Sequence, residues 1–139
     1  QRVQRNGVEW VLDVAHNVAA AEILAANLGG ESPPGRTLAV YGALRDKEAS
    51  AIVATLRARV DEWLLVDLPG VRGLGAAELR ERAFAQSDAC VTNAGAMPAA
   101  LEATARRARL GDRVVVFGSF HMVGPALEWL GLYSRSPRT

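Results

Sequence analysis

The hydrophobic positions of this chain form short apolar runs that alternate with segments of helical spacing. Such runs are typical of strands buried on both faces of a parallel sheet. They predict strands at residues 10–14, 37–42, 63–68, 89–92 and 113–118. Between and after them, apolar residues recur every three or four positions, which predicts helices over residues 17–28, 47–60, 76–85, 97–108 and 120–132.

This alternation of strands and helices predicts an α/β fold. Parallel strands joined by helices give a Rossmann-like, doubly wound, mostly parallel sheet with helices on both faces. Residues 1–4 and 8–14 flank Asn6-Gly7, a pair that favours the tight turn of an antiparallel hairpin. We therefore expect one domain over residues 1–132 that begins with an antiparallel strand, and a frayed polar tail over residues 133–139.

Several residues suggest where the helices begin and end. Gly29-Gly30 would end the first helix, Asp46 would cap the second, and Pro125 would lie in the first turn of the last. The buried face of the first helix is predicted to consist of Ala20, Ile23, Leu24 and Leu28.

The predicted topology brings polar residues together at one edge of the sheet. In parallel sheets, ligands bind where the strands end and the helices begin. The residues expected there are Asp13, His16, Gly42, Lys47, Asp67 and Ser119. Lys47 suits an anion, and Ser119 stands at a strand-to-helix turn where a ligand can approach the backbone. The alternative is structural: Asp13, Asn17 and Ser119 would only cap helices, and Lys47 would only be solvated.

Composition narrows the class of protein. Sixteen basic and 15 acidic residues among 139 give a net charge of +1, which indicates neither nucleic-acid nor membrane binding. The single cysteine, Cys90, lies in an apolar run and suits a reducing cytoplasm. No signal peptide or long apolar span is present, so we expect a soluble, cytoplasmic protein. Because the chain opens on Gln1 without a Met, we interpret it as a fragment of a larger protein.

Common catalytic motifs are missing from the chain. It contains no G-x-G-x-x-G, no phosphate-binding G-x-x-x-x-G-K-[ST] and no G-x-S-x-G. His16 and His121 lie far apart without a further ligand at zinc spacing, so no metal site is expected. The residues alone therefore predict a polar sheet edge without a complete catalytic set.

Three stretches of the chain together resemble a known family. They are LDVAHN at residues 12–17, VYGALRDK at residues 40–47 and VFGSF at residues 116–120. Their order and spacing are similar to those of the C-terminal domain of folylpolyglutamate synthases, which are often bifunctional with dihydrofolate synthase and belong to the Mur ligase superfamily. The resemblance covers essentially the whole chain. Val14 and Val18 stand where the family usually has Gly and Pro.

The resemblance implies a reaction and a division of labour. Such ligases use ATP to phosphorylate a carboxylate of folate or dihydropteroate, and the amino group of L-glutamate attacks the acyl phosphate. ATP and Mg²⁺ would be held mainly by an N-terminal ATPase region that this chain lacks, so the isolated domain should be inactive. In this chain Asp13 would contact ATP, while His16, Lys47 and Ser119 would bind glutamate, with His16 and Lys47 in catalytic roles.

Three other interpretations remain open from the sequence. The chain could be the C-terminal domain of another Mur-type amino-acid ligase. A receiver-like signalling domain would use Asp67 as a phosphoacceptor, but such domains also need an acidic pair after the first strand and a lysine after the fifth, where this chain has Asp13 and Ser119. A non-catalytic interaction module is the third, and no exposed apolar stripe favours it.

Overall fold

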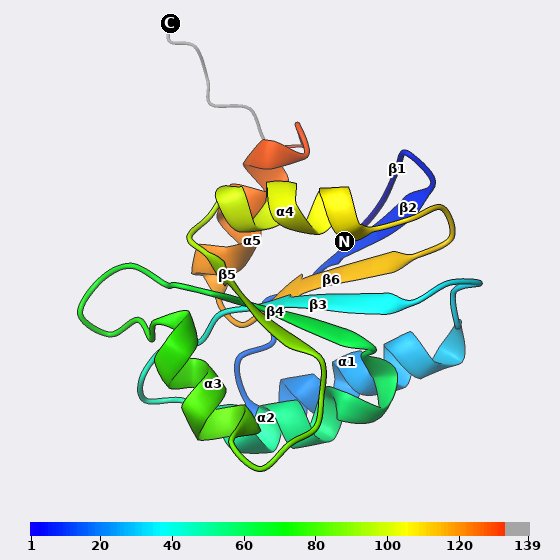
Figure 1. Cartoon of the computed structure of the whole chain (residues 1–139). Helices are drawn as coiled ribbons and strands as arrows, with labels where there is room; N and C mark the ends of the chain where they lie inside the picture. The colour runs from blue at the N-terminus through cyan, green and yellow to red at the C-terminus, as the bar shows by residue number, and fades with distance from the viewer. Residues whose placement is uncertain (133–139) are drawn as a thin grey trace, which may run out of the picture.

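A computed structural model describes residues 1–132 and shows an α/β sandwich (Figure 1). The predicted tail, residues 133–139, lies outside the described residues. The strands are β1 (Arg2–Arg5), β2 (Val8–Leu12), β3 (Thr37–Tyr41), β4 (Glu62–Val66), β5 (Val91–Gly95) and β6 (Arg113–Phe117). The helices are α1 (Val18–Gly30), α2 (Ala49–Leu56), α3 (Ala76–Phe84), α4 (Ala99–Arg107) and α5 (Phe120–Trp129), with a 3-10 turn η1 (Arg57–Arg59) after α2.

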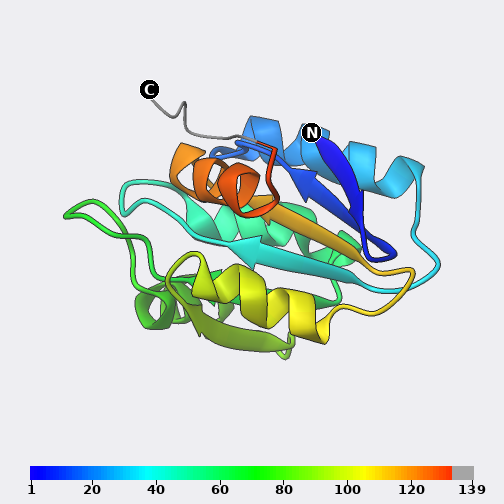
Figure 2. The same ribbon diagram turned by 90° about the horizontal axis from the view of Figure 1, so that it is seen from above.

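The six strands form one sheet in the order β1-β2-β6-β3-β4-β5. Only the β1–β2 pair is antiparallel, which confirms the predicted hairpin. Helices α1, α2 and α3 cover one face of the sheet, and α4 and α5 cover the other, as Figures 1 and 2 show. The doubly wound prediction is therefore confirmed, and the last strand of the chain, β6, lies between β2 and β3.

The two faces of the sheet bury separate hydrophobic cores. On the α1–α3 side, the ring of Tyr41 stacks on Phe117 with centroids 4.6 Å apart, and Trp63 meets Phe117 edge-on. On the α4–α5 side, Trp10 packs against Trp129 at 5.2 Å. Strands β3, β4 and β6 are buried along their whole length, as their continuous apolar runs predict.

The first helix differs from its prediction at its end and on its face. Asn17 caps α1 as expected, but the helix runs through Gly29 and Gly30 to its C-cap Glu31. The buried guanidinium of Arg113, from β6, donates to the carbonyls of Leu28 and Glu31, and so satisfies groups that a helix end leaves without partners. Ile23 is 67% exposed, because Ala21, rather than Ile23, faces the sheet with Leu24 and Leu28.

Other local predictions were also wrong. Asp46 does not cap α2, because its carboxylate pairs with Arg72, and α2 begins only at Ala49. Pro125 lies in the second turn of α5 rather than the first, and that helix ends at Trp129. Strand β5 spans Val91–Gly95, whereas a strand was expected over residues 89–92. Cys90, just before it, is exposed.

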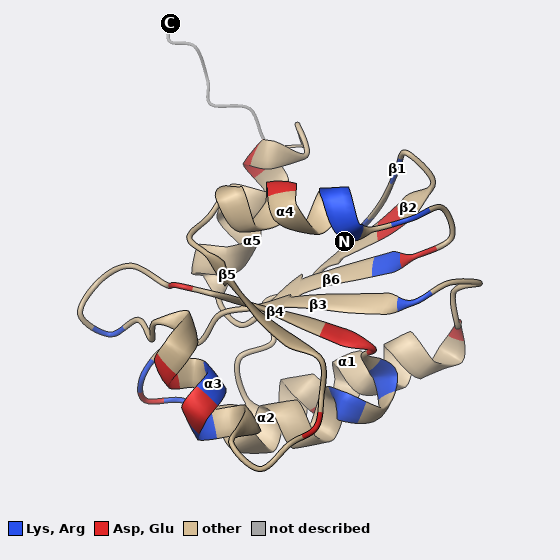
Figure 3. Cartoon of the chain, in the orientation of Figure 1, with Lys and Arg blue, Asp and Glu red and all other residues tan. Residues whose placement is uncertain are grey.

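The amino ends of the strands carry a network of paired charges. Figure 3 shows charged residues gathered at the amino ends of β3, β4 and β6. There Arg36 pairs with the buried carboxylates of Glu62 and Asp112, and Arg107 also pairs with Glu62. Burial alone would raise the pKa of Asp112, but hydrogen bonds from the backbone N–H groups of Arg109 and Arg36 outweigh it and lower that pKa. The bonds of Asp112 therefore stabilise the fold above the ordinary aspartate pKa, and this contribution is lost as the pH falls through the lowered pKa of Asp112.

No helix among the described residues is long and apolar enough to cross a membrane.

The hydroxyl of Tyr41 gives a test of the core. It is buried without a hydrogen-bond partner among the described residues, and burial raises the pKa of Tyr41 above its ordinary value. A buried polar group without a partner is destabilising, so Tyr41→Phe should raise the free energy of unfolding by about 1 kcal/mol. Tyr41→Leu, which loses the stack on Phe117, should lower it. Urea unfolding followed by circular dichroism measures both; a large loss of stability in Tyr41→Phe would contradict the expectation.

Candidate functional site

Strands β2, β6 and β3 end side by side at the carboxyl edge of the sheet. Asp13 directly follows β2, and its N–H donates to the carbonyl of Val116 in β6 at 3.0 Å. Gly118 and Ser119 follow β6, and Gly42 follows β3. The prediction that Asp13 and Ser119 end neighbouring strands is confirmed.

Two glycines make this junction unusually close. Gly118 has a φ of +126°, and a Cβ at this position would lie 1.9 Å from the carbonyl oxygen of Gly42. A Cβ on Gly42 would in turn meet the sulfur of Met122 at 2.7 Å. Residues with side chains cannot occupy either place without displacing a neighbour. The loops after β3 and β6 are therefore pressed together, and α5 starts directly against them.

Asp13 and His16 lie in the turn between β2 and α1. Asp13 is half-buried, and its Oδ1 accepts the N–H of Ala15 at 2.8 Å, so one carboxylate oxygen holds the turn. Its Oδ2 has no hydrogen-bond partner among residues 1–132. His16 Nδ1 lies 2.9 Å from the carbonyl of Val14. Because a carbonyl only accepts, Nδ1 must carry the hydrogen of this bond, which leaves Nε2 of the neutral ring as an acceptor.

Ser119 is the N-cap of α5. Its buried Oγ accepts the N–H of His121 at 3.0 Å, so Ser119 caps the helix. The cap uses a lone pair of the hydroxyl and leaves its hydrogen available for another acceptor. Helices α1 and α5 both begin at this edge, and the free N–H groups of their first turns favour anions there.

Lys47 lies before α2 rather than within its first turn. Its N–H donates to the carbonyl of Leu44 at 3.2 Å, and its own carbonyl accepts from Ala49 at 3.0 Å, so the backbone forms a tight turn. The side chain is half-buried, and no ion pair within residues 1–132 involves its ammonium. The positive charge of Lys47 is therefore available to a ligand.

Asp67, the other acidic residue expected at this edge, has a structural role in the fold. Its Oδ1 accepts the N–H of Ala76 at 2.6 Å, at the start of α3. Like Asp13, it therefore uses one carboxylate oxygen to hold a backbone N–H at this edge. Sequence reasoning also missed Arg72, which pairs with Asp46 next to Lys47. The two residues are 26 positions apart, and no local pattern joins them.

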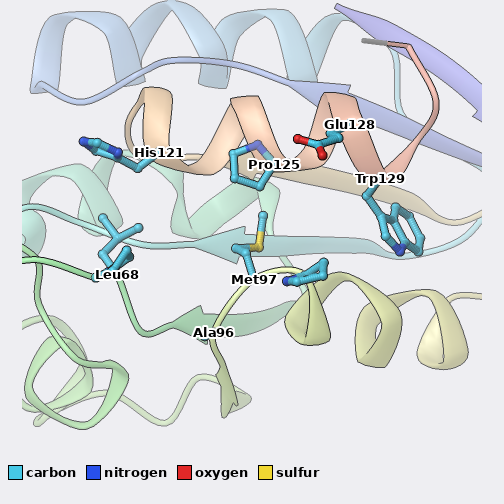
Figure 4. Close-up of a pocket in the computed structure, with 9 residues that line it drawn as sticks. Leu68, Ala96, Met97, His121, Pro125, Glu128 and Trp129 are labelled. Atoms are coloured by element: carbon cyan, nitrogen blue, oxygen red, sulfur yellow. The ribbon is translucent and has the colours of Figure 1, made fainter. Parts of the chain in front are cut away.

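A largely apolar pocket of about 570 Å³ opens beside this edge (Figure 4). Its lining residues come from the loops after β4 and β5 and from α5: Leu68, Pro69, Ala96, Met97, Pro98, His121, Pro125, Glu128 and Trp129. Leu68 also reaches Gly42, since a Cβ there would lie 3.1 Å from its side chain. The pocket therefore borders the Gly42–Gly118 junction.

Among the described residues, no group of three His, Cys, Asp or Glu side chains could hold a metal ion.

Comparison with known proteins places the chain among ligases. The profile of the family described as Mur ligase, glutamate ligase domain, matches residues 1–120. A curated relative, the dihydrofolate synthase/folylpolyglutamate synthase of Escherichia coli K12, is 37% identical over 118 residues, which are 85% of this chain and 27% of the relative. The chain thus spans little more than a quarter of that relative's length.

Solved structures show the same likeness. Escherichia coli FolC in complex with DHPP and ADP has a TM-score of 0.84 and 34% identity, with 94% of this chain and 30% of that chain covered. A bifunctional folylpolyglutamate synthase/dihydrofolate synthase with Mn, AMPPNP and L-glutamate bound has a TM-score of 0.82 and 35% identity, with 95% and 31% covered. The predicted Rossmann-like fold is therefore that of the C-terminal part of these enzymes.

The glycine junction predicts contrasting effects of two substitutions to alanine. Gly118→Ala places a methyl group against the carbonyl of Gly42 and requires a positive φ, so it should lower the free energy of unfolding by at least about 2 kcal/mol. Gly124→Ala is the matched control in α5, where a Cβ meets nothing within 4 Å. It should be neutral or stabilise by up to about 1 kcal/mol. Equal effects of both changes in urea unfolding would contradict the close approach.

Proposed function

The chain belongs to the Mur ligase family as a glutamate ligase domain, and we propose that residues 1–132 are the C-terminal domain of a folylpolyglutamate synthase. Such a protein adds L-glutamate to folate with ATP, and a bifunctional member also makes dihydrofolate. The substrates are thus ATP, L-glutamate and a folate or dihydropteroate, and the partner of this domain is the ATPase region of the same protein. ATP as a substrate also fits a cytoplasmic location.

The observation that carries this proposal is the set of unused polar groups at the carboxyl edge. Asp13 keeps one carboxylate oxygen, His16 keeps Nε2, and Ser119 keeps a hydroxyl hydrogen after each has served the fold. Lys47 adds a cation without a carboxylate partner among the described residues. Hydroxyl, ammonium and helix N–H groups suit the two carboxylates of glutamate.

The proposed roles follow from the charge and hydrogen-bonding capacity of each group. Lys47 and Ser119 would hold the glutamate carboxylates, and Nε2 of His16 would accept a proton from the amino group before it attacks. Asp13 would repel those carboxylates, so it suits hydroxyl donors such as the ribose of ATP. ATP supplies the activation of the acyl carboxylate, and this domain supplies the position of the amine.

We propose that the divalent cation of the full ligase is held mainly by the part of the protein outside this chain. The relatives include a structure with Mn and AMPPNP bound, so we propose that the full ligase uses ATP with a divalent metal ion. The described residues offer no three-ligand cluster for that ion.

Asp13 and Ser119 should affect different substrates in the full-length ligase. Asp13→Asn keeps the acceptor for the N–H of Ala15 but removes the charge, so it should raise the KM for ATP. Ser119→Ala should raise the KM for glutamate, because a hydrogen bond to a charged group contributes about 1.5–3 kcal/mol, or roughly ten- to a hundredfold. Asp67→Ala, which removes the α3 cap at the same edge, is the control for lost stability. Equal changes in both constants would point instead to a defect in domain closure.

The isolated chain should fold but catalyse nothing. Its two cores are complete within the described residues, so we expect cooperative unfolding in urea. It has no phosphate-binding loop of the G-x-x-x-x-G-K-[ST] type, so it should neither hydrolyse ATP nor ligate glutamate. A coupled assay for ADP release measures this; magnesium-dependent turnover by the chain alone would overturn the division of labour.

A further inference from the structure

Lys47 lies on a loop that is tied to a second, neighbouring loop. We call residues 42–48, between β3 and α2, the lysine loop, and residues 67–75, between β4 and α3, the bracing segment. The N–H of Arg45 donates to the carbonyl of Arg72 at 2.6 Å, and the N–H of Leu74 donates to the carbonyl of Ala43 at 3.0 Å. Leu44 and Gly73 form an isolated antiparallel bridge between the same loops.

The bracing segment makes a tight turn between Gly70 and Gly73. Gly73 donates its N–H to the carbonyl of Gly70 at 3.2 Å, and a Cβ on Gly73 would lie 2.3 Å from the carbonyl oxygen of Leu68. The segment thus folds back on itself and presents Arg72 to the lysine loop. A further link comes from α3, where Glu78 accepts from Arg45 and Arg82 at 2.8 Å each.

Side chains add a specific contact next to the lysine. The guanidinium of Arg72 pairs with the carboxylate of Asp46, the residue just before Lys47. Slight desolvation of Asp46 would raise its pKa, but the hydrogen bond and charge of Arg72 lower it, and the nearby charge of Lys47 lowers it further. Asp46 and Lys47 are neighbours in the chain, and the hydrogen-bonded partner of the Asp46 carboxylate is Arg72.

Resting on the proposed function, we propose that Arg72 is a positioning residue that occupies Asp46 and so keeps the Lys47 ammonium free for a carboxylate of the glutamate substrate. Without Arg72, the cation left to interact with Asp46 is its chain neighbour Lys47. An ion pair between these neighbours would neutralise the lysine and draw it away from its ligand. The two loops would remain joined by their backbone hydrogen bonds, because those do not involve the Arg72 side chain.

The test is steady-state kinetics of the full-length ligase, with glutamate varied and ATP and folate saturating. Arg72→Ala should raise the KM for glutamate by about two- to fivefold, the range that the competition of one exposed ion pair can produce. Arg72→Lys should restore most of the affinity, because it keeps a cation for Asp46. Arg80→Ala is the matched control: this exposed arginine of α3 has no ion-pair partner among the described residues. It should leave the KM unchanged.

A double substitution separates this role from a merely structural one. In Arg72→Ala/Asp46→Asn the competing carboxylate is gone, so the KM for glutamate should fall back towards that of the unmodified enzyme. If Arg72 only supported the loop, the double variant would be as impaired as Arg72→Ala or more so, and that result would overturn the proposal. Melting temperatures of all variants should stay close together, since the pair is exposed.

Lys47→Ala distinguishes the failure of this inference from failure of the proposed function. If Lys47 binds glutamate, Lys47→Ala raises the KM for glutamate, and adding Arg72→Ala to it has no further effect. An unchanged KM in Lys47→Ala would contradict the role of the lysine in the proposed function. A raised KM in Lys47→Ala, combined with an unchanged KM in Arg72→Ala, would reject only the role of Arg72.

Discussion

The close approach of Gly118 to Gly42 determines the geometry of the whole carboxyl edge. Because neither residue has a side chain, the loops after β6 and β3 come into contact as soon as their strands end. This contact fixes the start of α5, and hence Ser119, relative to the start of the lysine loop. Asp13 is joined to the same point through its hydrogen bond to Val116. Residues from three separate stretches of the chain are thereby placed at one edge by backbone packing alone.

The two edges of the sheet use their charges differently. At the amino edge, Glu62 and Asp112 are buried and fully engaged with arginines and backbone N–H groups. A ligand there would have to displace arginines from carboxylates that are themselves buried, and those charges would lose their partners. At the carboxyl edge, Asp13, Ser119 and Lys47 keep groups without partners among the described residues. Electrostatics, as well as topology, therefore favours the carboxyl edge as the place where a ligand binds.

The sequence predicted the features that local physics controls and missed those that depend on distant partners. Apolar runs identified the buried strands, and Asn6-Gly7 identified the hairpin, because both signals lie within a few residues. The predicted end of α1 was wrong because Arg113, far along the chain, donates to the carbonyls at the end of the helix. The prediction that Asp46 caps α2 was wrong because its carboxylate pairs with Arg72. The roles of Asp13, His16, Lys47 and Ser119 stay predictions, since only their common edge follows from the fold.

Capping and ligand binding, which the sequence presents as alternatives, are compatible at this edge. A carboxylate has two oxygens, and a hydroxyl has both lone pairs and a hydrogen. Asp13 uses one oxygen for the turn, and Ser119 uses a lone pair for α5. The cap fixes the side chain before a ligand arrives, so binding costs less conformational entropy than it would for a free side chain. The same bond that makes Ser119 look structural therefore also pre-positions it, and a residue with this double role is the kind that a strand-to-helix turn favours.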